Sequence, residues 1–191
     1  MHGIIFAELK KYVDARLGGD AWRSLLEQAG TGTRMYLPVR SYPDEDAVAL
    51  VSTASRITGL AVPAILEDFG LFIAPDLIAM YRALVRPEWR TLEFLENTES
   101  TIHRVVRIQN PEASPPEIRC TRDSDRQVTI HYASKRRMCS VARGIARGVA
   151  AHYGQAITLT EPRCMHRGDP SCEIRVRLDA DPSSEARPPL A

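Results

Sequence analysis

Residues 115–136 read PPEIRCTRDSDRQVTIHYASKR, and their pattern is the clearest indication of how the chain folds. Apolar and polar side chains alternate over residues 117–120 and again over residues 128–134, with a polar segment at 123–126 between the two runs. A period of two that is interrupted by a polar turn is typical of a β-hairpin. The hairpin therefore separates two parts of the chain whose patterns differ.

The part before the hairpin has the three- and four-residue spacing of amphipathic helices. We expect helices at residues 3–17, 20–30, 44–58, 62–70 and 75–85. Residues 90–109 contain neither Gly nor Pro, and one stripe at helical spacing runs through Leu92, Leu95, Glu99, His103 and Val106. This pattern predicts one long helix with His103 on its core-facing side.

The part after the hairpin predicts a helix at residues 138–154 and two further strands at residues 156–160 and 172–178. Helices followed by strand, strand, helix, strand and strand predict an α+β fold with a four-stranded antiparallel sheet. We expect the helical N-terminal half to pack on this C-terminal half. Residues 179–191 are rich in Pro, Ser and charge, so we expect a disordered tail there.

The composition is typical of a soluble globular protein. Lys and Arg number 25 and Asp and Glu number 24 in 191 residues, so the formal net charge of +1 gives no basic surface for nucleic acid. Glu8, Lys10 and Lys11 interrupt the apolar N-terminus, which therefore lacks the run of a signal peptide or a membrane span. We expect a cytoplasmic protein without a membrane segment, in which the four cysteines are reduced.

Tyr132, Ser134 and Arg136 lie two residues apart, so on a strand they point to one face. Two hydroxyl groups and a guanidinium can bind a phosphate or a pair of carboxylates, although the same alternation also occurs on solvent-exposed strands. His103 is open to two interpretations as well, a metal ligand or an ordinary helical histidine. Combined with apolar walls, an imidazole ligand and a carboxylate clamp are the parts that a haem site requires.

The chain resembles the H-NOX family of haem nitric oxide/oxygen binding domains over residues 1–178, which would form one such domain. The resemblance is carried, in order, by MHGIIF at 1–6, YPDE at 42–45, FLEN at 94–97, Ile102-His103, Pro115-Pro116 and YASKR at 132–136. The last segment contains the Tyr-x-Ser-x-Arg signature of the family. One residue more than expected lies between Phe94 and His103.

The resemblance implies a ferrous haem b, bound without covalent attachment between a helical subdomain of residues 1–60 and an α+β subdomain of residues 61–178. It makes His103 the proximal iron ligand. The propionates would be bound by Tyr132, Ser134 and Arg136. The remaining pocket residues would be Pro116, which presses on the haem, together with Ile5, Leu9, Ile73 and Val141.

The resemblance also implies a gas selectivity. Leu9, Ile73 and Val141 take the distal positions, and Val141 stands where O2-binding members of the family have a tyrosine. None of the three can donate a hydrogen bond to bound O2, which implies a sensor that binds NO and CO and excludes O2.

For signalling, the resemblance implies that NO weakens the bond from iron to His103, that the haem relaxes against Pro116 and that the two halves rotate. No catalytic segment is recognisable, so we expect no enzyme activity. The signal would pass to a separate protein such as a histidine kinase or a cyclic-di-GMP enzyme.

Cys139, Cys164, His166 and Cys172 offer sulfur and imidazole at a spacing that could complete a tetrahedral zinc site. They resemble the H-NOX subset in which three cysteines and one histidine hold zinc, except that the histidine of that subset precedes the two later cysteines. A zinc or thiol redox sensor built on these residues is the alternative function.

The remaining cysteine and histidines have no chemistry predicted for them. We expect Cys120 to be a core thiol, and His2, His131 and His152 to lie at the surface or in ordinary hydrogen bonds. A nucleophile beside a base, a phosphate-binding loop and paired carboxylates at a telling spacing are all absent from the sequence. A haem-free module for a small apolar ligand is a further alternative.

Overall fold

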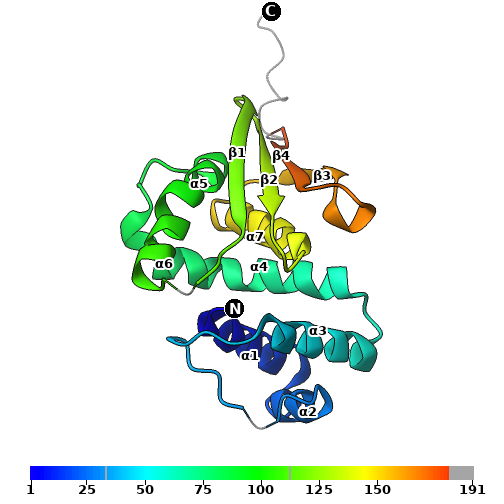
Figure 1. Cartoon of the computed structure of the whole chain (residues 1–191). Helices are drawn as coiled ribbons and strands as arrows, with labels where there is room; N and C mark the ends of the chain where they lie inside the picture. Colours follow the sequence, from blue (N-terminus) through cyan, green and yellow to red (C-terminus); the bar gives the residue numbers. More distant parts are fainter. Residues whose placement is uncertain (33, 112, 181–191) are drawn as a thin grey trace, which may run out of the picture.

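The computed structural model describes residues 1–32, 34–111 and 113–180. Its first half is helical, as the sequence predicted (Figure 1). The helices of this half are α1 Gly3–Leu17, α2 Ala21–Gln28, α3 Asp44–Thr58 and α4 Val62–Met80, followed by a 3₁₀ turn, η1, at Arg82–Leu84.

The second half combines helices with a sheet. Its elements are α5 Thr91–Asn97, η2 Glu99–His103, α6 Arg104–Gln109, β1 Glu117–Ser124, β2 Gln127–Ala133, α7 Cys139–His152, β3 Ile157–Arg163, η3 Met165–Arg167 and β4 Cys172–Leu178. The four strands form one antiparallel sheet in the order β1-β2-β4-β3. The predicted α+β class and its four-stranded sheet are confirmed.

Helix α4 crosses the middle of the molecule between the N-terminal helices and α7, which in turn covers the sheet (Figure 1). Helices α4 and α7 approach each other closely because glycines face the crossing. A Cβ atom on Gly144 would lie 2.0 Å from the carbonyl oxygen of Glu67, and one on Gly70 would lie 2.3 Å from that of Val141. Helices α4 and α7 therefore form an interface in which the backbones themselves are in contact.

The prediction of two helices at residues 62–70 and 75–85 is wrong, because α4 continues through Pro75. Proline in a helix interior costs about 3 kcal/mol by removing a hydrogen bond and crowding the preceding turn. Burial on both sides of Pro75 outweighs this cost, since Phe69, Ile73 and Ile78 are at most 6% exposed.

The prediction of one long regular helix at residues 90–109 is also corrected. The chain stays helical, but α5 and α6 are separated by the π-helical segment η2, in which the His103 N–H donates to the Thr98 carbonyl 3.0 Å away. A π-helical turn accommodates one extra residue without ending the helix. This is the interval in which the sequence has one residue more than the family resemblance leads one to expect.

No single helix in the described part of the chain is long and apolar enough to cross a membrane. Helices α3 and α4 would qualify only as a pair, and they are bent by 109° relative to each other. At the C-terminus, Asp179 is held in place, because its N–H donates to the Ala156 carbonyl at 2.9 Å. Most of the tail that we expected to be disordered, residues 181–191, lies outside the described residues.

Candidate cofactor site

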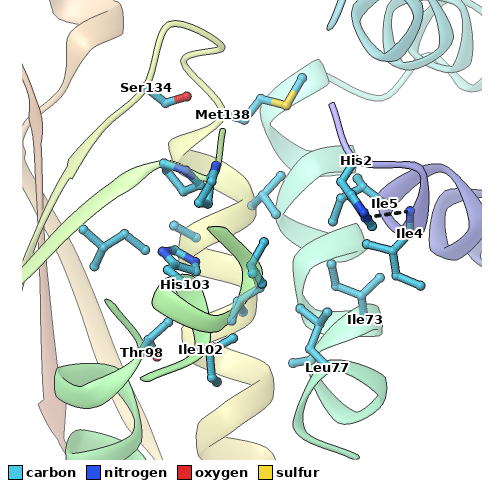
Figure 2. Close-up of a pocket in the computed structure, with 18 of the residues that line it drawn as sticks. His2, Ile4, Ile5, Ile73, Leu77, Thr98, Ile102, His103, Ser134 and Met138 are labelled. Carbon is cyan, nitrogen blue, oxygen red and sulfur yellow. Dashed lines mark hydrogen bonds between the residues drawn. The ribbon is translucent and has the colours of Figure 1, made fainter. Parts of the chain in front are cut away.

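A cavity of about 280 Å³ lies between the N-terminal helices and the second half of the chain. Most of the side chains that line it are apolar. Figure 2 shows His103 on one side of this cavity and Ile5, Ile73 and Leu77, from α1 and α4, on the other. An apolar slot with a few polar groups is the usual form of a small-molecule site.

The imidazole of His103 is positioned by a carboxylate. Its Nδ1 atom lies 2.8 Å from Oε2 of Glu99, four residues earlier, and the side chain is 15% exposed. A carboxylate can only accept, so the proton is assigned to Nδ1, which leaves the lone pair of Nε2 available as a ligand. A histidine whose other ring nitrogen is bound by a carboxylate is the usual arrangement of a metal-ligating imidazole.

Electrostatics favour the neutral form of this imidazole. Burial lowers the pKa of His103 below its usual 6.5, and the nearby positive charge of Arg107 acts in the same direction, against the hydrogen bond and charge of Glu99. Arg107 also forms an ion pair with Glu99, so the carboxylate is held from two sides. Neutral imidazole is the form that binds a metal.

Tyr132, Ser134 and Arg136, the carboxylate clamp, all line the same cavity. Tyr132 is 4% exposed, and burial raises the pKa of its hydroxyl to about 12, so it remains a donor at every physiological pH. The Ser134 Oγ accepts from the Arg136 backbone N–H at 3.2 Å, which fixes the turn after β2. The clamp is therefore brought to the cavity that His103 also faces.

The side chain of Arg136 lies between two parts of the chain. Its Nε atom is 2.8 Å from Oδ1 of Asp44 at the start of α3, and its Nη1 donates to the Ser114 carbonyl at 2.5 Å. The Nε contact is an ion pair without the alignment of a hydrogen bond, so Nε and Oδ1 both remain buried without a hydrogen-bond partner among the described residues. A cation with an unused buried donor is suited to an anionic ligand.

Asp44 is also bound by the N-terminus of the chain. The amino group of Met1 lies 2.8 Å from the same Oδ1 atom and 2.5 Å from the Tyr42 carbonyl oxygen. Partial burial opposes ionisation, but the amino group and the Arg136 guanidinium together lower the pKa of the Asp44 carboxyl. One carboxylate therefore connects the first residue, helix α3 and the clamp.

The other pocket residues predicted from the sequence line the cavity too: Ile5, Leu9, Ile73, Pro116 and Val141. Leu9 is 5% exposed and Ile73 is fully buried. His2, expected at the surface or in an ordinary hydrogen bond, accepts from the Ile4 N–H at 3.4 Å but also lines the cavity.

These residues suit a flat apolar cofactor that carries a metal and two carboxylates. The apolar walls match the ring, Nε2 of His103 provides one metal ligand, and Arg136 and Tyr132 provide donors for carboxylates. The donors and the apolar walls therefore fit the haem that the sequence predicted.

The second predicted set of residues meets away from this cavity. The sulfur of Cys164 lies 3.8 Å from that of Cys139 and 3.7 Å from that of Cys172, and all three side chains are at most 5% exposed. Zinc–sulfur bonds of about 2.3 Å in a tetrahedron place two sulfurs about 3.8 Å apart. The sulfurs therefore already have the spacing of a zinc site.

The fourth member of this cluster in the structure is Glu161, and His166, the residue expected there, lies outside it. The ligand atoms of Glu161 and the three cysteines all lie within 4.8 Å of one another, and Oε1 of Glu161 is buried without a hydrogen-bond partner among the residues described. His166 is exposed, and its Nε2 lies 2.6 Å from the Arg137 carbonyl oxygen instead. Glu161 precedes the two later cysteines, as the histidine of the zinc-binding subset does.

Cys120 has no place in this cluster. Its sulfur donates to the Leu95 carbonyl at 3.2 Å, and burial raises the pKa of its thiol to about 12. It is a packed thiol on β1, as expected.

Glu99 and Glu161 are among the residues near these sites for which no role was predicted from the sequence. Glu99 had a usable signal, because a glutamate four residues before a histidine lies beside it on a helix. Glu161 had none, because a carboxylate on a strand gives no indication that it will face three cysteines.

Comparison with known proteins supports the architecture. The haem-NO-binding (HNOB) family model matches residues 2–161. The chain is similar to the soluble guanylate cyclases gcy-31 and gcy-35 of Caenorhabditis elegans, with 22% identity over 138 residues and 24% over 158 residues. The matches cover 72% and 78% of this chain but 20% and 22% of the cyclases, so the chain spans about a fifth of their length.

The structure is also similar to solved ones. The crystal structure of an H-NOX protein from S. oneidensis in the Fe(II)NO ligation state has a TM-score of 0.88 at 27% identity, covering 94% of this chain and 100% of that one. An H-NOX domain from Shewanella oneidensis in the Fe(II)CO state has a TM-score of 0.85 at 28% identity, covering 95% and 100%. An unliganded H-NOX protein from K. algicida, at 19% identity, a TM-score of 0.83 and coverages of 95% and 98%, shares the fold.

Proposed function

Since the chain belongs to the haem-NO-binding (H-NOX) family, whose domains are haem-based gas sensors related to soluble guanylate cyclase, we propose that it senses nitric oxide. It binds NO and CO at a ferrous haem b, excludes O2, and acts as a sensor rather than as an enzyme. The observation that carries this proposal is the single apolar cavity lined by both His103 and the carboxylate clamp.

Each part of the site has a role in holding the cofactor. The neutral imidazole of His103, oriented by Glu99, ligates the iron, and Tyr132, Ser134 and Arg136 bind the propionates. Pro116 and Ile5, which also line the cavity, would pack against the bound ring. Bound haem would supply an iron atom with one position open to a gas.

The side chains on the distal side determine which gas is retained. Leu9, Ile73 and Val141 line the cavity and carry no hydrogen-bond donor. Bound O2 carries partial negative charge and is stabilised by a donor, whereas NO and CO need none. These three positions therefore offer no donor to bound O2, and they favour NO and CO over O2.

Signal transmission is proposed to use the link through Asp44. Arg136 pairs with Asp44 through Nε and also lines the cavity, so its guanidinium can exchange one anionic partner for the other. When Arg136 leaves Asp44 for the ligand, the Met1 amino group remains the cationic partner of Asp44 at the start of α3. Residues 1–60 and 61–178 then shift as two bodies, which gives a partner two different surfaces to bind.

The output is proposed to act through another protein or domain, such as a histidine kinase or a cyclic-di-GMP enzyme. The cytoplasm is the compartment that suits this protein, because its buried thiols are all free.

Optical spectra test this proposal. Protein reconstituted with haem and reduced without air is exposed separately to NO, CO and O2, alongside a Val141→Tyr variant. We expect spectral shifts with NO and CO but no stable O2 complex in the wild type, and a gain of O2 binding in the variant, where the phenol supplies the missing donor. A wild type that forms a stable O2 complex contradicts the proposed selectivity.

We also propose a structural zinc ion held by Cys139, Cys164, Cys172 and Glu161. The sulfur spacing and the unpartnered Oε1 of Glu161 support it. Arg143 lies 3.2 Å from the other oxygen of Glu161 and orients the carboxylate. Burial of the sulfurs weighs against the alternative of a direct thiol redox sensor, since such thiols react as exposed thiolates.

A further inference from the structure

His2 is a polar residue beside the apolar wall that α1 gives to the cavity. It caps the start of α1 with extended backbone, and it lines the cavity together with Ile5 and Leu9 of the helix. Figure 2 shows His2 beside Ile5, across the cavity from His103. Its side chain is therefore available to a ligand in this cavity.

The two ring nitrogens of His2 have different environments. Nδ1 accepts from the Ile4 N–H and caps the start of α1, which assigns the proton to Nε2. Nε2 is buried and has no hydrogen-bond partner among the residues that the structure describes. A buried N–H without an acceptor is unfavourable, so this donor indicates an acceptor supplied by a ligand.

The position of His2 is fixed at the clamp end of the cavity. Met1, its neighbour, shares the Asp44 Oδ1 atom with Arg136, each at 2.8 Å. Gly3, the next residue, donates to the Arg40 carbonyl at 2.7 Å, and a Cβ atom there would lie 2.0 Å from the Leu37 carbonyl oxygen. The absence of a side chain at Gly3 lets the segment before α3 close over the start of α1 and hold His2 in place.

We propose that the Nε2–H of His2 donates a hydrogen bond to a carboxylate of the haem, opposite the clamp. This inference rests on the proposed function and adds a haem-binding residue from the N-terminal half. The clamp residues all follow β1 in the chain, whereas His2 precedes α1, so the haem carboxylates would be held by both halves at once. Loss of His2 then weakens haem retention without removing the iron ligand.

The test measures the rate of haem loss to an excess of apomyoglobin. Any purification tag is placed at the C-terminus of the full chain, because the Met1 amino group pairs with Asp44. His2→Phe removes both nitrogens, whereas His2→Asn keeps a helix-capping side chain but is too short to present the donor. Both variants are expected to lose haem about tenfold faster than the wild type, the effect of one hydrogen bond to a charged group.

Reconstitution with haem dimethyl ester is the matched control, because esterification removes the charged carboxylates. With this ligand the difference in haem loss between the wild type and both variants should shrink, because an uncharged ester oxygen is a weaker acceptor than a carboxylate. Should His2→Phe fail to fold, as judged by its urea midpoint without haem, His2→Asn and the ester comparison still decide the outcome.

The alternative results are distinct. Release from His2→Asn at the wild-type rate, or an effect that is undiminished with the ester, overturns this inference and leaves the proposed function standing. If the variants change CO affinity but release haem at the wild-type rate, His2 contacts the bound gas and not a haem carboxylate. That result also overturns this inference. A wild type that takes up no haem overturns the proposed function, and this inference with it.

Discussion

The Nδ1 atom of His103 lies 2.8 Å from the Glu99 carboxylate, within the π-helical turn η2. The π turn places the histidine one residue later than a regular helix would, and π turns often occur at functional sites. Glu99 is in turn paired with Arg107 on α6, so the imidazole is supported from both ends of the turn.

We therefore expect Glu99→Gln to weaken His103 as a ligand. The amide still accepts a hydrogen bond but has no charge, so the imidazole becomes a poorer electron donor. The iron–histidine stretching frequency of the ferrous protein should fall, and haem should be lost about tenfold faster. Glu96→Gln, on α5 and paired with Arg122, is the control and should leave the frequency unchanged.

Asp44→Asn tests the link between the halves. Removing the carboxylate charge leaves the Met1 amino group and Arg136 without their common partner, and should cost about 1 kcal/mol or less because Asp44 is 39% exposed. The lowered pKa of Asp44 gives the sign: the stabilisation is present above its ordinary pKa of 3.8 and is lost as the pH falls through the lowered value.

Thermal unfolding of the haem-free protein measures this effect. The difference between Asp44→Asn and the wild type should shrink at high salt and at low pH. Asp20→Asn, whose side chain is fully exposed near Arg23, should behave as the wild type. An Asp44 variant as stable as the wild type at neutral pH and low salt would show that the link has no energetic role.

Much of the fold could be predicted from the sequence, because the patterns that specify it are local. The alternation in residues 117–134 determines which faces of β1 and β2 are buried. The polar turn between the two alternating runs makes these strands a hairpin, which is antiparallel. Pro75 could not be judged in the same way. Whether a proline ends a helix depends on packing against α1 and α7, which are distant in the sequence.

The candidate sites show the same contrast between what local sequence patterns predict and what depends on packing between distant segments. His103 and the clamp follow recognisable spacing, but the position of His2 in the cavity depends on where α1 begins and on the close approach at Gly3. The place of Glu161, and not His166, beside the three cysteines depends on how β3 and the turn η3 fold back onto α7. Neither relationship is expressed as a spacing along the chain.

Glu8 is expected to make stability depend on pH in the sense opposite to that of Asp44. It is 2% exposed on α1, and burial raises the pKa of its carboxyl above the ordinary 4.5, against the charge of Lys11 at 2.8 Å. A raised pKa means that its contribution is fully present below pH 4.5 and is lost as the pH rises through the raised value.

Glu8→Gln cannot ionise, so it avoids this loss. Its melting temperature should exceed that of the wild type by a few degrees at neutral pH and should match it below about pH 4. Glu27→Gln, at an exposed position on α2, is the control and should show no such trend. Equal pH profiles for Glu8→Gln and the wild type would contradict the assigned burial cost.

Zinc content tests the second site. We expect one zinc per chain in protein purified without chelator, and Glu161→Gln should weaken zinc binding by more than the roughly 10- to 100-fold that is typical when a residue supporting a metal ligand is altered, because here a proposed ligand is itself changed. His166→Ala and Cys120→Ser should leave the zinc content unchanged, because neither side chain reaches the cluster. Loss of zinc in His166→Ala with retention in Glu161→Gln would reverse the assignment.

The most direct test of the haem assignment is the ferrous spectrum of the wild type and of His103→Gly, recorded with and without added imidazole. We predict that the wild type binds one haem with an iron–histidine band, that His103→Gly loses this band, and that imidazole restores it by occupying the vacated place. A His103→Gly protein whose spectrum equals that of the wild type, or a wild type with no specific Soret band, would contradict the account.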